Sequence, residues 1–447
     1  MSIIDRLNKK EFLNLLDDES QDVILVQGAR QVGKTTFIQQ ALRDRSSVTT
    51  VNLEKDLDFL RDLDRTLSFE EFTRLVQLKV GTSAFDIRGS VLFIDEAQES
   101  EKIGSYIRFM KEDWKNIRVI LSGSSMSRIF RNTQRVPVGR FRPWLITPLT
   151  YGEFLSASPH FLLKEVYAGF CASPQKGVAD NPIHSEFLKS MDEYLTVGGL
   201  PAVVTTYFSG ADYVARRRFI LDSQEDDFVR KSSLADRSLF NKGMKGVANF
   251  IGMPSKKSHV HEMNSISEKV LSELAAWNLI LEVEQKGTNS TTQHLSKRYV
   301  YDCGVAQDLR EMPFPRLSLV STQSPVLRTQ LGGLFENVLL LQIIGERTFF
   351  ESISGWKKGS SDSPEVDFIL RHETGTLPIE CKATQKISSK NWSALQTYLE
   401  ITEQKIGFIV SAAPFEVSRR GKHILINLPI YFATRSNIFK CAEIYSG

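Results

Sequence analysis

Hydrophobic residues in the first 125 positions follow two patterns, continuous apolar runs and a spacing of three and four residues. Continuous runs that end at turn residues are typical of strands buried on both faces, and the second spacing is typical of amphipathic helices. Strands are therefore expected at 22–27, 48–53, 90–95 and 118–122, and helices at 3–16, 34–42, 69–80 and 104–115. This alternation predicts an α/β fold with a doubly wound parallel sheet, which binds ligands at the carboxyl ends of its strands.

The turn after the first expected strand has the composition of a phosphate-binding loop. Residues 27–37 read QGARQVGKTTF and fill every fixed position of the Walker A pattern G-x-x-x-x-G-K-[ST]. In such a loop the backbone N–H groups face a phosphate chain, Lys34 reaches the β- and γ-phosphates, and the Thr35 hydroxyl ligates Mg²⁺. The alternative is a solvated glycine-rich turn, but the strand before the loop and the helix after it favour nucleotide binding. The residues expected to bind are Gly28, Ala29, Arg30, Gln31, Val32, Gly33, Lys34, Thr35 and Thr36.

Two acids follow the apolar run that begins at Ser90. Asp95 stands where a Walker B carboxylate positions Mg²⁺ or its water, and Glu96 is placed to deprotonate an attacking water. A second acid of this kind favours a hydrolase over a kinase or a simple GTPase. The alternative is that both acids open a solvated helix.

Two further residues are candidates for contact with the γ-phosphate. Ser122 ends the strand at 118–122, where many such ATPases carry a polar sensor, and its alternative role is in capping the following helix. Arg140, in the segment PVGRFR, is a candidate arginine for the phosphates of its own site or a neighbour's. A surface arginine is the alternative there.

Seven segments in order carry a family resemblance: VILVQGARQVGKTT, VLFIDEAQ, RVILSGSS, VGRF, TPLTYGEFL, YLTVGGLP and YDCG. Together they resemble the AAA-superfamily ATPases of bacteria and archaea that carry a C-terminal domain of unknown function with a restriction-endonuclease-like fold. The resemblance covers nearly the whole chain. It implies ATP as the nucleotide in place of GTP.

The middle of the chain is expected to be largely helical. Residues 150–240 are interpreted as a helical lid over the nucleotide, with Gly198-Gly199-Leu-Pro201 as a turn and the charged runs 216–218 and 226–227 as a solvated helix face. Helical spacing at 266–279, followed by a hairpin around a polar loop, suggests a winged helix. Winged helices bind DNA or serve as packing modules, and both interpretations stay open here.

The last hundred residues predict an αβββαβ order. A helix is expected at 330–344, three strands near 348–353, 366–370 and 377–383, a helix at 392–399 and a strand at 405–411. With Asp367, Glu380 and Lys382 this order resembles the core of PD-(D/E)xK nucleases. Alternation places Glu380 and Lys382 on one face of their strand, beside Asp367 of the neighbouring strand.

This arrangement suggests a second Mg²⁺ site. Asp367, Glu380 and the carbonyl of Cys381 would hold the ion, Glu336 of the preceding helix would supply a further ligand, and Lys382 would stabilise charge or position a water. The alternative is a salt bridge between Glu380 and Lys382 at the edge of the sheet. Fold alone does not establish cleavage.

Composition narrows the class of protein. A chain of 447 residues with 41 % hydrophobic and 24 % charged residues is expected to form several globular units. The net charge of +3 is nearly neutral and gives no general indication of nucleic-acid binding. No apolar run is long enough for a membrane span, and no signal peptide is expected. The four cysteines match neither a disulfide framework nor a metal site, which favours the reducing cytoplasm: Cys171, Cys303, Cys381 and Cys441.

These patterns predict four units: a P-loop ATPase core at 1–155, a helical lid at 156–240, a winged-helix-like segment at 241–320 and a nuclease-like domain at 321–447. The expected function is Mg²⁺-dependent ATP hydrolysis coupled to DNA or RNA binding or processing. The rival is a nucleotide-dependent switch that binds a protein partner through a catalytically silent C-terminal domain. A P-loop kinase is a third class. A homo-oligomer is compatible with a role for Arg140 in a neighbouring site.

Overall fold

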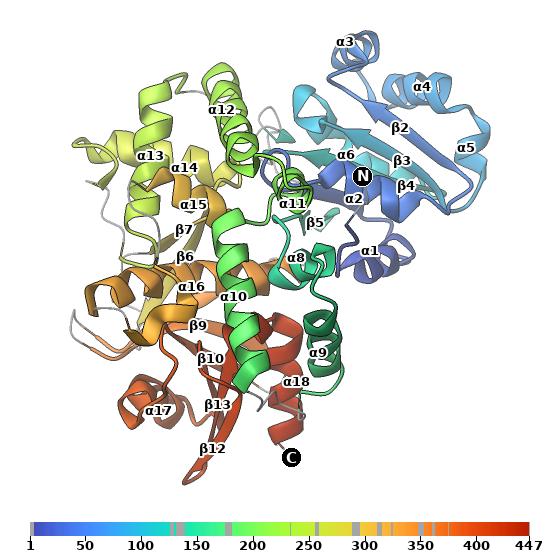
Figure 1. Ribbon diagram of the computed structural model, residues 1–447. Helices are drawn as coiled ribbons and strands as arrows, with labels where there is room; N and C mark the ends of the chain where they lie inside the picture. The colour runs from blue at the N-terminus through green and yellow to red at the C-terminus, as the bar shows by residue number, and fades with distance from the viewer. Residues whose placement is uncertain are drawn as a thin grey trace.

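The computed structural model describes residues 4–125, 129–130, 139–174, 181–232, 234–254, 259–287, 296–310, 315–322, 325–346, 353–359, 363–373 and 375–446. Most of the strand expected at 348–353 lies outside these ranges, as does the polar loop of the expected hairpin. Within them the chain forms two sheets joined by helices (Figure 1). Among the residues that the structure describes, none of the helices has the length and hydrophobicity of a membrane-spanning segment.

The N-terminal sheet is parallel throughout and has the strand order β2-β3-β4-β1-β5. Its strands are β1 (Val23–Gln27), β2 (Val48–Asn52), β3 (Ser90–Asp95), β4 (Ile117–Gly123) and β5 (Phe141–Leu145). Every residue of β1, β3 and β4 is buried, as their continuous apolar runs predict. The α/β expectation for this unit is confirmed.

Helices cover both faces of this sheet, because successive residues of a strand point to opposite sides. Ile24 and Val26 join one apolar cluster, and Val23 and Leu25 join the other. The first cluster includes side chains of α1 (Lys9–Leu16) and α2 (Lys34–Leu42), and the second includes those of α3 (Leu57–Arg65), α4 (Phe69–Val80) and α6 (Ile103–Asp113). The short helix α5 (Ser83–Asp86) follows α4.

A layer of helices continues from this sheet. It consists of α8 (Tyr151–Ala157), α9 (Phe161–Ala172), α10 (Asn181–Val197), α11 (Pro201–Phe208), α12 (Tyr213–Lys231), α13 (Arg237–Asn249) and α14 (Asn264–Ala276). The expected turn separates α10 from α11. Gly198 has φ +83°, and a Cβ built there would approach an Asp302 carboxylate oxygen to 2.4 Å, so glycine is required at this position.

The second sheet has eight strands in the order β12-β13-β11-β10-β9-β8-β6-β7. They are β6 (Ile280–Gly287), β7 (Lys297–Val300), β8 (Ser354–Lys357), β9 (Glu365–His372), β10 (Gly375–Lys382), β11 (Ile406–Ser411), β12 (Glu416–Arg420) and β13 (His423–Pro429). The helices among them are α15 (Cys303–Leu309), α16 (Pro325–Gly345), α17 (Ser393–Thr402) and α18 (Arg435–Ser446). From α16 to β11 the elements follow the order αβββαβ.

The β6–β7 hairpin belongs to this second sheet. β6 pairs antiparallel with β7 and parallel with β8. The hairpin and the strands after residue 353 therefore belong to one continuous sheet. The helices and hairpin at 241–320 are therefore continuous with the elements that follow them.

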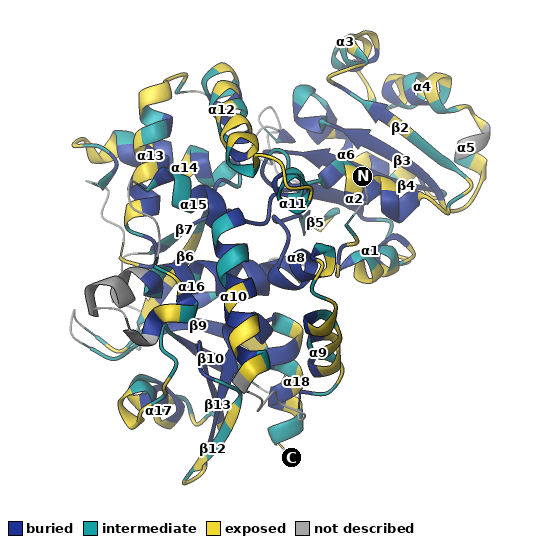
Figure 2. Ribbon diagram, viewed as in Figure 1, coloured by how far each residue is buried: buried dark blue, intermediate teal, exposed yellow. Residues whose placement is uncertain are grey.

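Aromatic side chains of the helical layer pack against residues that follow the last strand of the C-terminal sheet. The rings of Phe170 and Phe432 stack at 3.9 Å, and those of Phe187 and Tyr431 stack at 4.5 Å. His184 Nδ1 lies 2.7 Å from the Tyr431 hydroxyl. In Figure 1 the helix α10 runs through the centre of the molecule, and Figure 2 shows buried residues continuing from one sheet through this layer to the other.

Candidate nucleotide site and C-terminal acid cluster

The P-loop connects β1 to α2, and two glycines allow its path. Gly33 has φ +93° at the start of α2. At Gly28, a Cβ would lie 2.1 Å from the carbonyl oxygen of Ile146, so any side chain there would collide with the strand-to-helix connection beside the loop. The loop therefore brings its backbone N–H groups and the amino end of α2 to the carboxyl edge of the sheet, which is the arrangement that binds phosphate.

Lys34 lies folded back over this loop. Its ammonium donates to the carbonyl oxygens of Gly28 and Ala29, both at 3.0 Å, and the residue is only 7 % exposed. Burial lowers the pKa of Lys34, while the nearby Glu96 and Asp95 carboxylates oppose that shift. A phosphate group would therefore compete with two loop carbonyls for this ammonium.

Asp95 is the centre of the hydrogen-bond network at the end of β3. Its Oδ2 accepts from the Thr35 hydroxyl at 2.9 Å and from the Asn52 amide at 3.0 Å, and its Oδ1 accepts from the Ser122 hydroxyl. Thr35 and Asp95 thus present oxygen donors side by side, which fits the ligand preference of Mg²⁺. Ser122, a candidate phosphate sensor, contacts Asp95. Sequence reasoning missed Asn52, although it lies next to the end of a predicted strand at the same edge.

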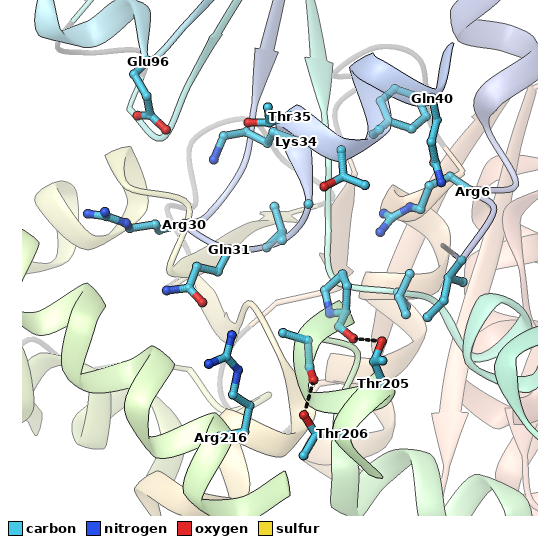
Figure 3. Close-up of a pocket in the computed structure, with 18 residues that line it drawn as sticks. Arg6, Arg30, Gln31, Lys34, Thr35, Gln40, Glu96, Thr205, Thr206 and Arg216 are labelled. Atoms are coloured by element: carbon cyan, nitrogen blue, oxygen red, sulfur yellow. Dashed lines mark hydrogen bonds between the residues drawn. The ribbon is translucent and has the colours of Figure 1, made fainter. Parts of the chain in front are cut away.

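Glu96 adopts a left-handed backbone conformation, φ +55°, directly after the strand. Its Oε2 accepts from the Gln98 side-chain amide at 2.5 Å, which fixes the direction of the carboxylate. Glu96 lines the same cavity as Lys34 and Thr35. The structure therefore brings the proposed base to the P-loop, on an adjacent wall of the cavity (Figure 3).

That cavity has a volume of about 740 Å³, which is within the range of small-molecule sites. The P-loop forms one wall, and α11 with the start of α12 forms another. In Figure 3, Arg30 and Arg216 extend at one end of the cavity, while Arg6 and Gln40 lie at the other. Arg6 and Arg216, from two other segments, thus line the same cavity as Arg30 of the P-loop.

Arg140 lies at the opposite end of the sheet. Its carbonyl oxygen accepts from the N–H of Val23, the first residue of β1, whereas the P-loop follows the last residue of that strand. Five residues of strand separate the two ends by roughly 16 Å. Arg140 also lies 3.5 Å from a carboxylate oxygen of Glu112. The structure therefore corrects the expectation that Arg140 serves its own nucleotide site, and a role in a neighbour's site stays a prediction.

The charged runs of α12 form a solvated face only in part: Arg216, Arg218 and Asp226 are exposed as expected, whereas Arg217 and Asp227 are buried. Arg217 is 3 % exposed and pairs with Asp308 of α15 through two contacts of 2.7 and 2.6 Å. Asp227 is 2 % exposed and pairs with Arg30 of the P-loop. The interpretation as solvated was wrong for Arg217 and Asp227, because α12 packs between two units and these two side chains meet partners from each.

The acids of the C-terminal sheet do come together. Asp367 Oδ2 accepts from the backbone N–H of Cys381 at 2.8 Å, and Glu380 pairs with Lys382 on the same strand. The other carboxylate oxygen of Glu380 is buried and has no hydrogen-bond partner among the described residues. The Glu380–Lys382 salt bridge, the alternative interpretation of this motif, is thus present.

A lysine that sequence reasoning did not assign lies at the centre of this cluster. The ammonium of Lys297 is 2.8 Å from Asp367, 3.2 Å from Glu336 and 2.7 Å from Glu365, and its side chain is 4 % exposed. Tyr299, two residues along β7, donates its hydroxyl to Glu336 at 2.8 Å. The second strand of the expected hairpin was the available signal, since alternation along it places Lys297 and Tyr299 on one face.

Burial and the neighbouring charges shift the pKa values of Glu336 and Lys297. Burial and the neighbouring Asp367 raise the pKa of Glu336 to about 8. Burial alone would lower the pKa of Lys297, but Asp367 and Glu336 raise it well above its usual value. Within the described residues no group of three or more His, Cys, Asp or Glu side chains is arranged for a metal ion. Lys297 compensates Asp367 and Glu336, and Lys382 compensates Glu380, so a divalent ion would have to displace these ammonium groups from the acids.

Comparison with known protein families supports the ATPase interpretation of the N-terminal unit. Residues 20–155 match a family described as an AAA domain. The chain therefore carries an AAA domain. Residues 331–431 match a family described as a domain of unknown function, DUF4143. With the parallel sheet and the P-loop, the first match makes the N-terminal unit of this protein an AAA-type P-loop ATPase domain, while the second leaves the activity of the C-terminal unit open.

No curated protein sequence matches the chain. Among solved structures, a Walker-type ATPase of Pyrococcus abyssi has 16 % identity and a TM-score of 0.44, over 69 % of this chain and 96 % of its own. A variant of RuvB from Thermotoga maritima has 16 % identity and a TM-score of 0.26, over 63 % and 90 %. The Pif1 helicase from Candida albicans has 13 % identity and a TM-score of 0.25, over 44 % and 48 %. Likenesses of this strength assign no function, which rests on the residues of this chain.

Proposed function

We propose that this protein binds ATP with Mg²⁺ and hydrolyses it, and that nucleotide occupancy switches the state of its C-terminal unit. The observation that carries the first part is the contact of 2.9 Å between the Thr35 hydroxyl and Asp95, beside a P-loop and in one cavity with Glu96. These residue types are the ones that nucleotide hydrolysis requires at this edge of a parallel sheet.

Each residue has a role in this proposal. The loop N–H groups and Lys34 bind the phosphates, and Thr35 with Asp95 would hold Mg²⁺, which neutralises phosphate charge when bound. Glu96 accepts the proton of the attacking water, since Gln98 orients its carboxylate. Ser122 and Asn52 support this set by fixing Asp95.

Phosphate release from ATP tests this assignment. Lys34→Ala is expected to abolish binding of a fluorescent ATP analogue, and Glu96→Gln is expected to retain binding but lose at least about 100-fold in turnover. Lys189→Ala and Glu101→Gln are matched controls, since both residues are exposed and lie outside the cavity. Full turnover in both site variants would refute the proposal. Transfer of phosphate to a small acceptor in place of water would identify a kinase.

For the C-terminal unit, the buried ammonium of Lys297 supports the switch over the nuclease. Nucleic-acid processing is the second candidate, because Asp367, Glu380 and Lys382 lie on one sheet as in the PD-(D/E)xK pattern. The hydrolysis assay with added DNA and RNA, followed by a cleavage assay with Mg²⁺ or Mn²⁺, separates the two. Cleavage that disappears in Asp367→Asn would establish the second candidate and exclude the silent domain.

A further inference from the structure

The helix α12 presents two buried polar side chains to the P-loop. Gln224 and Asp227 are three residues apart, so they share one face of the helix, and they are 1 % and 2 % exposed. The Gln224 amide donates to the carbonyl oxygen of Arg30 at 3.0 Å, and the Asp227 carboxylate pairs with the Arg30 guanidinium. Both the backbone and the side chain of one P-loop residue are therefore held by the same helix.

The other end of the Gln224 amide is also held. Its Oε1 accepts from the Tyr301 hydroxyl at 2.8 Å, and Tyr301 is itself buried. A buried donor or acceptor that loses its partner costs about 1–3 kcal/mol. A displacement of the Arg30 carbonyl must therefore either break this connection at that cost or move Gln224 and Tyr301 with it.

Tyr301 directly follows β7, the strand that reaches the acid cluster. Lys297 and Tyr299 of β7 contact the carboxylates there, and Asn337 of α16 clamps the end of the strand through both the N–H and the carbonyl of Val300, at 2.7 and 2.9 Å. Tyr301, which contacts Gln224, is thus only four positions along the chain from Lys297, whose ammonium lies at the centre of the cluster. β7 is the edge strand of the sheet, paired with β6 on one side and held at Val300 by Asn337, so these bonds connect a displacement of Tyr301 to Lys297.

Nucleotide binding would disturb the first link of this chain. Lys34 now donates to the carbonyl oxygens of Gly28 and Ala29, the two residues before Arg30. If the ammonium turns to a phosphate, these carbonyls lose their donor, and the loop adjusts next to the residue that α12 holds. We infer that Gln224, Asp227 and Tyr301 are positioning residues that transmit nucleotide occupancy of the P-loop to β7 and the acid cluster. This inference rests on the proposed function, because it requires the P-loop to bind nucleotide.

Hydrogen–deuterium exchange on the full chain tests whether nucleotide binding at the P-loop alters β7. Exchange is measured across 297–309 with and without the non-hydrolysable β,γ-imido analogue of ATP plus Mg²⁺, in the wild type, Tyr301→Phe and Gln224→Met. The wild type is expected to change its exchange rate there at least about threefold on binding. Tyr301→Phe, which removes a single hydroxyl, is expected to bind the analogue and lose that change. Tyr398→Phe is the matched control, because its hydroxyl is 3.0 Å from Thr376 at a site remote from the P-loop.

Nucleotide affinity is measured on the same samples, so that a failure of the proposed function can be distinguished from a failure of this inference alone. A wild type that binds no analogue contradicts the proposed function and the inference together. A wild type that binds it with unchanged exchange at 297–309 overturns the inference alone. A full response in Tyr301→Phe and Gln224→Met also overturns it, whereas loss in both with retention in Tyr398→Phe supports it. If Gln224→Met fails to fold, Tyr301→Phe decides the question.

Discussion

Lys297 Nζ lies 2.8 Å from Asp367 Oδ1, so a strand that precedes α16 supplies the counter-charge for acids carried by α16 and β9. Glu336 and Glu365 complete the cluster at 3.2 and 2.7 Å. Removing one partner of a buried ion pair costs more than the pair itself contributes, because the remaining charge stays buried and uncompensated. Lys297 is thus a requirement of the fold as well as a feature of the candidate site.

Lys297→Met is expected to lower the free energy of unfolding by about 3–5 kcal/mol, since it leaves several carboxyl groups without a cation. The matched control is Lys382→Met, whose side chain is 36 % exposed and pairs, among the described residues, with Glu380 only. Chemical denaturation of both variants measures the difference. Mn²⁺ is expected to restore stability to Lys297→Met more than to the wild type, because the freed acids can then take a divalent ion. Equal stability of the two variants would contradict this account of the cluster.

Ser122→Ala is expected to retain ATP binding and to lower turnover about tenfold, because the hydroxyl orients Asp95. Since Asp95 is the expected Mg²⁺ ligand, the Mg²⁺ concentration for half-maximal activity should rise while the KM for ATP at saturating Mg²⁺ stays the same. Steady-state kinetics at varied Mg²⁺ measure both quantities. A rise in the KM for ATP alone would assign Ser122 to the phosphate instead.

Asp302 joins the helical layer to the C-terminal unit. It is fully buried and accepts from the N–H groups of Gly199 and Val305 at 2.7 and 2.8 Å. Asp302→Ala leaves two buried donors without partners and is expected to cost about 2–5 kcal/mol of unfolding free energy. Asp212→Ala, which removes an exposed helix cap on Ala215, should cost about 1 kcal/mol. Thermal and chemical unfolding measure the stability of the two variants. A smaller loss of unfolding free energy in Asp302→Ala than in Asp212→Ala would refute the argument.

His184 makes stability depend on pH. Burial lowers its pKa below the usual value of 6.5, so the unfolded chain binds a proton more readily than the folded one. Stability is therefore expected to be complete above about pH 6.5 and to fall as the pH decreases through the lowered pKa. His184→Phe should flatten this slope, although it also loses the contact with Tyr431. The control is His160→Gln at a more exposed position, and an unchanged slope in His184→Phe would exclude this source.

The sequence predicts the parts of the fold that depend on local pattern. The buried strands β1, β3 and β4 and the Walker residues are where the apolar runs and the loop motif place them. β5 was missed because it lies at the edge of the sheet and reads FRPWL, with an arginine and a proline that obscure any alternation. The helix α3 was missed because charged residues outnumber the apolar ones in it.

The C-terminal site was predictable only in part, for a different reason. Asp367, Glu380 and Lys382 belong to one local pattern, so alternation brings them near one another. Lys297 joins them only because β6 pairs with β8 across a long stretch of sequence. The burial of Arg217 and Asp227 likewise depends on packing between units, which no window of sequence around α12 contains. Long-range pairing, in both cases, decides which charges meet.

The path of β6 through the second sheet has a practical consequence. A fragment that begins near residue 321 would retain β8 but lose the strand that covers its outer edge. Unpaired strand edges recruit other chains, so this fragment is expected to aggregate or to dimerise through β8. The same pairing limits the exchange of C-terminal units between related proteins by recombination. A recombined chain keeps the second sheet intact only if the strands β6 and β7 are exchanged together with the C-terminal unit.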